Sequence, residues 1–351
     1  SRRSCRLAHV RYRAAVFTNL THEQLEYHGS FERYRSDKAN LFRALDAGCY
    51  ADARQPDVDS ESAADPVSGA GQPGSGAVTP GSPRSGAGGP FGVVNTDDPN
   101  ASYFLAATAR PVVTYGFAAA ADYRAADVRL SPSGSSFTLV TPTGSAACSI
   151  PVPGRFNVAN ALAAAAVVRT LTGCDETTLA DAIASLRPVH GRMSVVAEEP
   201  FSVVVDYAHT PGSFENVFPF FREQTAGRLI AVFGSAGERD VAKRPIQGGI
   251  ADRYADVVVL ADEDPRGEDR MKILQDIAAG TTGRSEGRDL LMIPDRRLAI
   301  RRAFEVARPG DTVLLLGKGH EASIIGPSGT EPWDEIEVAR DELARLRGRS
   351  R

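Results

Sequence analysis

Four short apolar runs in the second half of the chain each end in a cluster of polar, ionisable residues. The runs span residues 201–205, 229–233, 255–261 and 312–316. Patterns typical of helices lie between and after them, at 213–223, 246–254, 271–279 and 296–307. Short apolar runs that alternate with such helices predict parallel strands joined by crossover helices. We therefore expect an α/β domain with a doubly wound, Rossmann-like sheet.

The carboxyl ends of these four runs predict where a ligand binds. In a parallel sheet such ends share one edge, and doubly wound sheets bind their ligands there. The run at 229–233 leads into a glycine turn at 234–237, which charged residues follow up to Arg244. A glycine turn alone is a weak signal, because a surface turn before a solvated helix has the same pattern. Four polar ends in succession favour one shared polar site.

The first half of the chain predicts a second unit. Strand-like runs lie at 14–17, 93–95, 111–115, 137–141 and 148–152, and helix-like patterns lie at 31–45, 155–171 and 175–186. A length of 351 residues suggests two domains. We expect the first at 1–190 and the second at 191–351, with a hinge near 187–192 and a charged terminal helix at about 335–347. Residues 51–90, rich in Gly, Pro, Ser, Ala and Asp, predict a disordered insertion in the first domain.

Composition excludes several classes of partner. The net charge is −4 and no basic stripe carries interleaved aromatic residues, so nucleic-acid binding is not expected. The longest apolar stretch, near 161–168, is alanine-rich and too short to cross a bilayer, so no membrane association is expected. The four cysteines are far apart and show no metal-binding spacing, which favours a reducing compartment and a cytoplasmic protein.

Single residues of the first half allow more than one interpretation. Lys38 lies in the middle of the 31–45 helix, where residue type alone favours a solvated lysine. Asn157 and Asn160 lie one turn apart on one helix face, although Asn157 could also serve as a helix cap. Asp97 and Asp98 could form a metal-binding acid pair, but an Asx turn is the commoner use of Asp-Asp-Pro.

Nine sequence blocks together resemble the Mur ligases. They are AVFTNLTHEQLEYHG (15–29), YRSDKANLF (34–42), VVNTDDP (93–99), GRFNVANALAA (154–164), RPVHGRM (187–193), VVDYAHTPGSFENV (204–217), FGSAGERDVAKRP (233–245), EDPRGED (263–269) and LLGKGHE (315–321). Each block is weak by itself, but all occur in the family's order over nearly the whole chain. The resemblance implies a truncated Mur ligase central domain, which binds ATP, followed by the family's C-terminal, amino-acid-binding domain.

The resemblance also implies a reaction. It is strongest to family members that add the third amino acid to UDP-N-acetylmuramoyl-L-alanyl-D-glutamate in peptidoglycan biosynthesis. In that reaction ATP phosphorylates a peptide carboxylate, and the amine of an amino acid attacks the acyl phosphate to form an amide. Such chemistry requires that the two reactants be held together and that the phosphate charge be met by fixed cations, with Mg²⁺ as the metal.

Matching positions imply site residues. Lys38 resembles the family's carbamoylated, magnesium-binding lysine, and Arg192 resembles a phosphate contact at the hinge. Four residues resemble the ATP-binding set: Asn157, Asn160, Asp206 and His209. Seven resemble the pocket for the incoming amino acid: Arg239, Glu263, Asp264, Pro265, Arg266, Gly317 and Glu321. Arg6 stands where the family holds the nucleotide-sugar substrate.

The chain departs from the family pattern in three ways. It contains no Gly-x-x-Gly-Lys-Thr/Ser phosphate loop, which the family places before the position of Ser1, so we expect an incomplete chain that is inactive alone. Gln24 replaces a metal-binding histidine of the family and binds hard cations poorly, so the sequence does not decide whether a second metal site is present. The family's Asp-Asn-Pro-Arg signature begins here with Glu263-Asp264. The added carboxylate favours an extra substrate amine and Arg266 an extra carboxylate, so diaminopimelate, lysine and ornithine all remain candidates.

Two other functions remain possible on the sequence. The missing loop and Gln24 would also suit a degenerate, non-catalytic relative that binds an amino acid or a partner. A folylpolyglutamate synthase-like ligase is a further alternative, although the DYAHTP, EDPR and GKGHE blocks together speak against it. The sequence does not indicate an oligomeric state.

Overall fold

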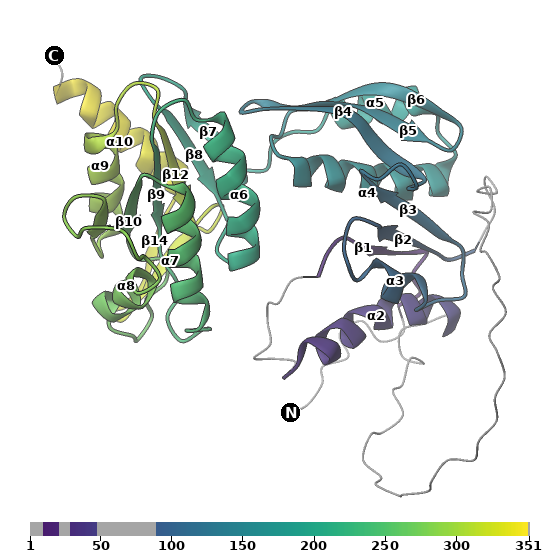
Figure 1. Cartoon of the computed structure of the whole chain (residues 1–351), viewed down its shortest axis with the longest axis horizontal. Helices are drawn as coiled ribbons and strands as arrows, with labels where there is room; N and C mark the ends of the chain where they lie inside the picture. Colours follow the sequence, from purple (N-terminus) through teal and green to yellow (C-terminus); the bar gives the residue numbers. More distant parts are fainter. Residues whose placement is uncertain (1–9, 21–28, 48–88, 350–351) are drawn as a thin grey trace, which may run out of the picture.

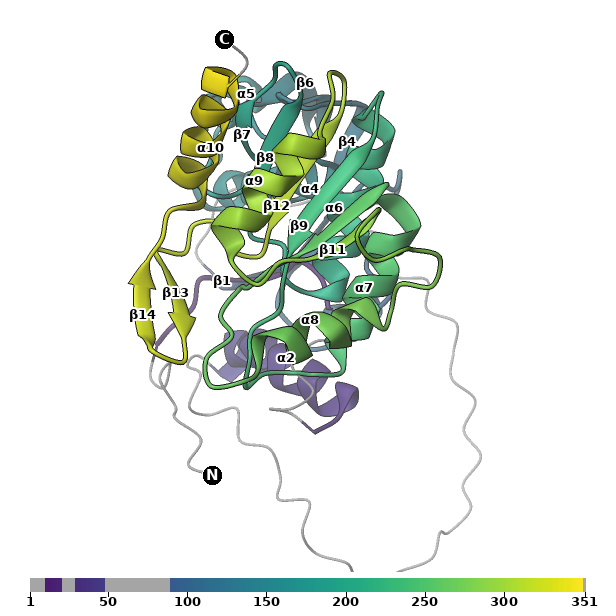
Figure 2. The ribbon, with the colours of Figure 1, turned by 90° about the vertical axis from the view of Figure 1, so that its left-hand side faces the viewer.

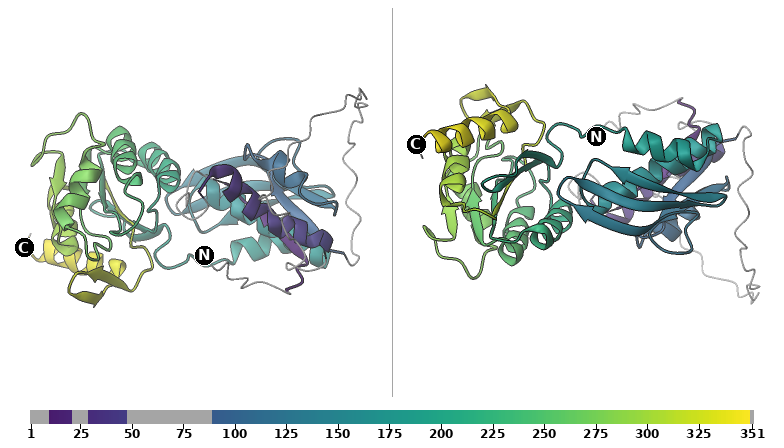
Figure 3. Two further views of the ribbon diagram at one scale, coloured as in Figure 1. Left: turned by 90° about the horizontal axis from the view of Figure 1, so that it is seen from below. Right: turned by 90° about the horizontal axis from the view of Figure 1, so that it is seen from above.

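A computed structural model describes residues 10–20, 29–47 and 89–349. Arg6, Gln24 and nearly all of the Gly/Pro/Ser-rich stretch at 51–90 lie outside the described residues. The described elements form two α/β units, with the amino-terminal unit on the right of Figure 1 and the carboxyl-terminal unit on the left. The views from below and above in Figure 3 show the two units as separate lobes. No helix within the described ranges is long and apolar enough for a bilayer crossing.

The first unit is built on a six-stranded sheet. Its strands, in spatial order, are β1 (Ala14–Phe17), β2 (Phe91–Asn95), β3 (Val112–Gly116), β4 (Tyr123–Ser131), β5 (Gly134–Thr141) and β6 (Gly144–Ile150). Strands β1 to β4 pair in parallel, and β4, β5 and β6 form an antiparallel meander. One face packs on α2 (Phe31–Ala47) and α3 (Ala101–Leu105), and the other on α4 (Arg155–Thr172) and α5 (Glu176–Ala184).

The sequence did not predict β4. Its alternating residues Tyr123 and Ala125 are buried, but the strand is rich in alanine and arginine, and Val128 is its one β-branched residue. Pairing with β5 stabilises it, although the register shifts between Ala126 and Arg129 where Asp127 adopts a φ of 52°. The tertiary context, rather than local propensity, therefore forms this strand.

The second unit is the expected doubly wound domain. Its sheet has the order β11-β10-β9-β12-β8-β7, parallel throughout except at the edge strand β7. The strands are β7 (Ser194–Ala197), β8 (Ser202–Asp206), β9 (Leu229–Phe233), β10 (Val257–Leu260), β11 (Leu290–Met292) and β12 (Thr312–Leu316). Helices α6 (Pro211–Gln224), α7 (Lys243–Tyr254) and α8 (Arg270–Ala278) cover one face, and α9 (Arg296–Val306) and α10 (Glu335–Arg349) cover the other (Figure 2). A hairpin of β13 (Ser323–Gly326) and β14 (Gly329–Pro332) projects beside the sheet.

The packing of strand β9 explains why residues 229–233 are apolar without interruption. Leu229, Ala231 and Phe233 pack toward α6, α7 and α8, whereas Ile230 and Val232 pack toward α9 and α10. Every residue of the strand is buried because helices cover both faces. The expectation of a parallel sheet covered on both sides is confirmed, and the loops after β8, β9, β10 and β12 leave the sheet at the same edge.

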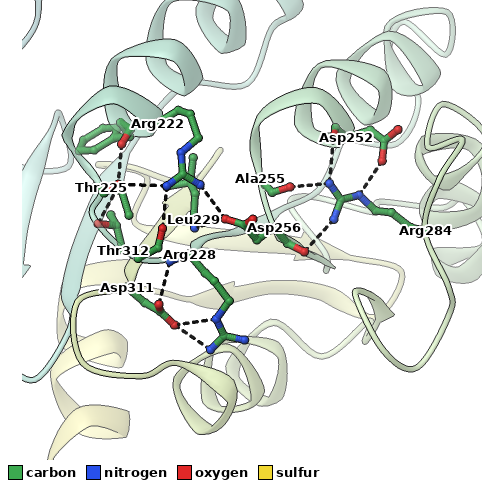
Figure 4. Close-up of polar contacts among 12 residues, drawn as sticks. Arg222, Thr225, Arg228, Leu229, Asp252, Ala255, Asp256, Arg284, Asp311 and Thr312 are labelled. Atoms are coloured by element: carbon green, nitrogen blue, oxygen red, sulfur yellow. Dashed lines mark hydrogen bonds and ion pairs between the residues drawn. The ribbon is translucent and has the colours of Figure 1, made fainter.

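The opposite edge of this sheet carries a network of arginines and aspartates (Figure 4). Asp311, which precedes β12, accepts hydrogen bonds from the Arg228 backbone N–H at 2.8 Å and from its guanidinium at 2.7 and 3.1 Å. Asp256, which precedes β10, accepts one from the Leu229 N–H at 2.8 Å. Arg284 donates to Asp252 Oδ1 at 2.6 Å and to nearby backbone carbonyls. These residues fasten the strand starts and lie away from the ligand edge.

Candidate functional site

A cleft of about 1850 Å³ is lined by residues of both units. It receives the loops after β8, β9, β10 and β12 together with the first turns of α4. Ten of the residues that the sequence singled out line it: Asn157, Asn160, Arg192, Asp206, His209, Arg239, Glu263, Asp264, Arg266 and Glu321. Residues remote in sequence thus line one cleft, seven of them at the carboxyl edge of a parallel sheet, and their individual roles stay predictions.

Three other predicted residues are described but do not line this cleft. Lys38 is exposed on α2, with its Nζ 5.4 Å from the centre of the Tyr34 ring. Pro265 is buried within the loop after β10. A Cβ on Gly317 would lie 3.2 Å from Glu263 Oε2, so the absence of a side chain there leaves room for the glutamate.

Asp206, the last residue of β8, connects the site to the segment between the two units. Its carboxylate accepts the Met193 N–H at 2.8 Å and the Ala208 N–H at 2.7 Å. Burial raises the pKa of Asp206, although these two hydrogen bonds and the nearby Arg192 and His209 counteract the increase. Asp206 therefore fixes backbone on both sides of the site.

Both the backbone carbonyl and the imidazole ring of His209 make contacts that fix its position. Its carbonyl oxygen accepts hydrogen bonds from Lys243 Nζ and Gln247 Nε2, each at 3.0 Å. Its Nδ1 lies 2.8 Å from the Tyr207 carbonyl oxygen, and the two rings are 4.5 Å apart. These contacts from α7 fix the start of α6 against the cleft.

Tyr207 lies between two predicted site residues. The Arg192 guanidinium stacks 4.3 Å from the centre of its ring, and its hydroxyl donates to Glu321 Oε1 at 3.3 Å. Burial raises the pKa of the Tyr207 hydroxyl, and the charge of Glu321 raises it further. The sequence analysis gave Tyr207 no role; the only available signal was an aromatic residue within the polar cluster after β8.

Lys318 is a second residue that sequence reasoning missed. Its side chain is fully buried, and its Nζ donates to Asp264 Oδ1 at 2.9 Å and to Glu321 Oε2 at 2.7 Å. The same Asp264 oxygen accepts the Ile325 N–H, and the Ile325 carbonyl accepts the Arg266 N–H, both at 2.9 Å. The loops after β10 and β12 and the β13–β14 hairpin are therefore joined.

Glu263 and Arg266 each have a polar atom without a partner. Glu263 is only 6% exposed, and its Oε2 forms no hydrogen bond within the described part of the chain. The buried Nε of Arg266 likewise has no partner there, and Arg266 adopts a φ of 54°. A buried polar atom without a hydrogen bond is costly. A ligand ammonium at Glu263 and a ligand carboxylate at Arg266 would remove that cost.

A buried ion pair supports these loops from beneath. Arg296 and Glu335 are 1% and 0% exposed, and their closest nitrogen and oxygen are 2.6 Å apart. Arg296 also donates to the carbonyls of Asp262 and Leu316, the residues directly before Glu263 and Gly317. Trp333 Nε1 donates to Glu335 Oε2 at 2.6 Å, and the Trp333 N–H donates to the carbonyl of Ala322.

A magnesium site is not evident in the described residues. They contain no group of three or more His, Cys, Asp or Glu side chains placed to bind a metal ion. Asp98 Oδ1 instead accepts the Asn100 N–H at 2.7 Å, which is the contact expected of an Asx turn. Asp97 and Asp98 also accept the more distant backbone N–H groups of Phe117 and Leu20, both at 2.9 Å. Lys38 and the acid pair thus do not form a metal cage here.

Comparison with known domains and proteins places the chain among named relatives. Residues 191–319 match "Mur ligase, glutamate ligase domain", and residues 1–58 and 83–168 match "Mur ligase middle domain". Proteins named UDP-N-acetylmuramyl-tripeptide synthetase from Roseiflexus sp. (strain RS-1) and Treponema denticola are 47% and 42% identical over 97% and 98% of this chain. A UDP-N-acetylmuramoyl-L-alanyl-D-glutamate–2,6-diaminopimelate ligase from Geobacillus kaustophilus is 40% identical over 94%. The chain spans 62%, 60% and 60% of these relatives' lengths.

Solved structures show the same architecture. A UDP-N-acetylmuramoyl-L-alanyl-D-glutamate–2,6-diaminopimelate ligase is 30% identical, with a TM-score of 0.55 over 95% of this chain and 61% of its own. MurF from Acinetobacter baumannii, at 15% identity, has a TM-score of 0.64 over 95% of this chain and 60% of its own. Folylpolyglutamate synthase from Mycobacterium tuberculosis, at 16% identity, has a TM-score of 0.63 over 87% of this chain and 61% of its own. The last two likenesses show the fold alone.

Proposed function

This chain belongs to the Mur ligase family, and from that premise we propose that it forms the ATP-binding and amino-acid-binding part of a ligase. The ligase adds a diamino acid to UDP-N-acetylmuramoyl-L-alanyl-D-glutamate in the cytoplasm. Relatives with names of this kind align over 94–98% of the chain, which supports the proposal. We also propose that residues 1–190 act as the middle domain and 191–351 as the amino-acid-binding domain.

The proposed reaction has two steps. A peptide carboxylate oxygen attacks the terminal phosphorus of ATP, and ADP leaves with the bonding electron pair. The substrate amine then attacks the acyl carbon, inorganic phosphate leaves, and the amine loses a proton. Held reactants and fixed cations accelerate such steps. We assign adenine contacts to Asn157 and Asn160 and a phosphate contact to Arg192, which is exposed to the cleft.

Magnesium is the family's expected metal, but the described residues do not fit it. Lys38 is exposed away from the cleft lining, and no three-ligand group exists within the described ranges. The cleft's own cations are available for the phosphate charge: Arg155, Arg192, Arg239 and Lys243 line it. Electrostatic stabilisation by such preplaced cations is the contribution that this chain offers.

The choice of amino acid rests on one observation: Glu263 and Arg266 both line the cleft, and each has a buried polar atom without a partner within the described residues, Glu263 Oε2 and Arg266 Nε. A carboxylate there suits an ammonium, and a guanidinium suits a carboxylate because it offers parallel donors. Lysine and ornithine carry only an ammonium at the distal end. Diaminopimelate carries both groups there, so we propose diaminopimelate as the preferred substrate.

The experiment assays the gene product that carries this chain. ATP and the UDP-muramoyl dipeptide are supplied with diaminopimelate, lysine or ornithine, and phosphate release and the amide product are measured. We expect the highest kcat/KM for diaminopimelate, and no amino-acid-dependent phosphate release by residues 1–351 alone, which contain no phosphate loop. Phosphate release that requires glutamate and a folate would favour the folylpolyglutamate alternative. Amino-acid binding without turnover by the gene product would favour the non-catalytic relative.

A further inference from the structure

Three carboxylates converge where the loops after β10 and β12 meet the cleft. Glu263, Asp264 and Glu321 all line it, and the first two are 6% and 8% exposed. Like charges at close range repel, and burial strengthens the repulsion because water screens it less. A nearby cation therefore lowers the electrostatic repulsion among the three carboxylates.

The cation that contacts this group is Lys318. It is completely buried and is absent from the cleft lining, so a substrate in the cleft would not touch it. Its ammonium is shared between Asp264 Oδ1 and Glu321 Oε2, at 2.9 and 2.7 Å. The second Glu321 oxygen is taken by the Tyr207 hydroxyl. Glu263 Oε2 is the oxygen that receives no hydrogen bond within the described residues.

We propose that Lys318 is a positioning and specificity-determining residue of the ligase. By occupying Asp264 and Glu321, it leaves Glu263 as the carboxylate that receives the distal ammonium of the diamino acid. Lys318 thus directs where the substrate charge goes without touching the substrate. This inference rests on the proposed function, since it concerns the same amino-acid pocket.

The glycines on both sides of Lys318 permit this placement. Gly317 and Gly319 adopt φ values of 103° and 47°, which residues with side chains rarely adopt. A Cβ on Gly319 would lie 2.6 Å from the Tyr207 Cβ, and one on Gly317 would lie 3.2 Å from Glu263 Oε2. The backbone can therefore lie close to both neighbours while the lysine passes beneath the carboxylates.

The test compares variants of the gene product that carries the chain. In Lys318→Met the two carboxylates lose their shared cation, and we expect the KM for diaminopimelate to rise about tenfold or more, with kcat and the KM for ATP nearly unchanged. Lys318→Arg retains a cation and should recover most of the affinity. Lys318→Met with Glu321→Gln removes the repulsion as well as the cation, and should recover part of it.

Arg284→Met is the matched control. Arg284 is a buried cation, 7% exposed and paired with Asp252, at the opposite edge of the same sheet (Figure 4). The substitution Arg284→Met should lower the midpoint temperature of thermal unfolding without changing the KM for diaminopimelate. An unchanged KM in Lys318→Met, an equal loss of ATP affinity, or the same KM increase in Arg284→Met would overturn the inference. A wild-type enzyme that uses no diamino acid would refute the proposed function itself, and the inference with it.

Discussion

At the scale of single residues, Arg266 combines several unusual features. Its backbone lies in the left-handed region, its N–H is fastened to Ile325, and its Nε lacks a partner within the described chain. A strained backbone that is held by its surroundings is common at ligand sites. The strain and the unpartnered guanidinium nitrogen together support a recognition role rather than a role in stability.

Arg266→Ala should weaken diaminopimelate binding and spare ATP. A hydrogen bond to a charged group is worth about 1.5–3 kcal/mol, so we expect a loss of roughly tenfold to a hundredfold in affinity. Calorimetric titration of each ligand measures both effects, and Arg288→Ala, at an exposed arginine that does not line the cleft, serves as the control. An equal loss of ATP affinity would mean that the amino-acid pocket is assigned to the wrong residues.

Asp311 should make stability depend on pH. Burial tends to raise its pKa, but the Arg228 and Arg308 N–H groups and the Arg228 guanidinium outweigh this and hold the pKa of Asp311 below its ordinary value. Stability from this group is thus present above the unfolded pKa, near 3.8, and is lost as pH falls through the lower folded pKa.

Asp311→Asn tests that dependence. At pH 7 we expect the free energy of unfolding to fall by about 2 kcal/mol, because the charged partner of Arg228 is lost. Urea titrations at several pH values should show the difference from wild type shrinking below about pH 3.8. Asp341→Asn, at an exposed aspartate that pairs with Arg297, should show little change at any pH. A difference that stays constant across pH would contradict the linkage.

At this scale the sequence predicted where the site lies, but it did not predict the roles of all of its residues. Polar residues after parallel strands could be predicted because the strands are apolar along their whole length. Lys318 and Tyr207 could not be assigned from pattern alone, since Asp264 lies 54 residues from Lys318 and Glu321 lies 114 residues from Tyr207, each in the loop after another strand. Such partnerships exist only once the sheet brings its loops to one edge.

At the scale of elements, α7 and α8 pack through glycines. A Cβ on Gly248 would lie 1.9 Å from the Ile277 carbonyl oxygen, and one on Gly280 would lie 1.8 Å from that of Pro245. Neither helix could keep its present position beside a larger residue at these points. The close approach explains glycines in α7 that helix propensity alone would disfavour.

Gly248→Ala should separate the two helices and lower the free energy of unfolding by about 1–3 kcal/mol. Its matched control is Gly249→Ala in the same helix, where the added Cβ would lie an ordinary 3.4 Å from the Gly280 carbonyl oxygen. That control should be neutral or stabilising by about 0.5–1 kcal/mol, because alanine favours helix over glycine. Equal effects of the two substitutions, measured by thermal unfolding, would contradict the packing argument.

The short strands that the sequence missed share a physical cause, which differs from that of β4. Strands β7, β11, β13 and β14 are only three or four residues long and lie at sheet edges or in the hairpin. Short edge strands are half-exposed and carry no long apolar run, so their pairing depends on a neighbour rather than on their own pattern. The long helices and the central parallel strands, by contrast, agree closely with their predicted ranges.

At the scale of the whole molecule, the segment that joins the two units touches the substrate-side loop directly. Gly191, with a φ of 71°, lies against the loop after β12, and a Cβ there would lie 2.2 Å from both Gly319 C and His320 N. Asp206 holds the next part of this segment through the Met193 N–H. The connection between the units and the amino-acid pocket are therefore in backbone contact.

Gly191→Ala should disturb the pocket from outside it. We expect a higher KM for diaminopimelate in the gene product, since the loop that carries Lys318 and Glu321 must move away from the added methyl group. Gly173→Ala is the control, because Gly173 also has a φ of 71° but an added Cβ would meet nothing within 4 Å. Both variants therefore carry a backbone strain of about 1–2 kcal/mol, and only Gly191→Ala adds a steric contact. A KM that rises equally in both variants would show that backbone strain, not the contact, is responsible.

The position of Trp333 allows its intrinsic fluorescence to report on the amino-acid pocket. It is the only tryptophan in the chain. Its indole is hydrogen-bonded to Glu335, and its amide to Ala322, directly after Glu321. Any rearrangement of the loops above Arg296 alters the polarity around this indole. Its emission wavelength should therefore track amino-acid occupancy in real time, without a label or a coupled assay.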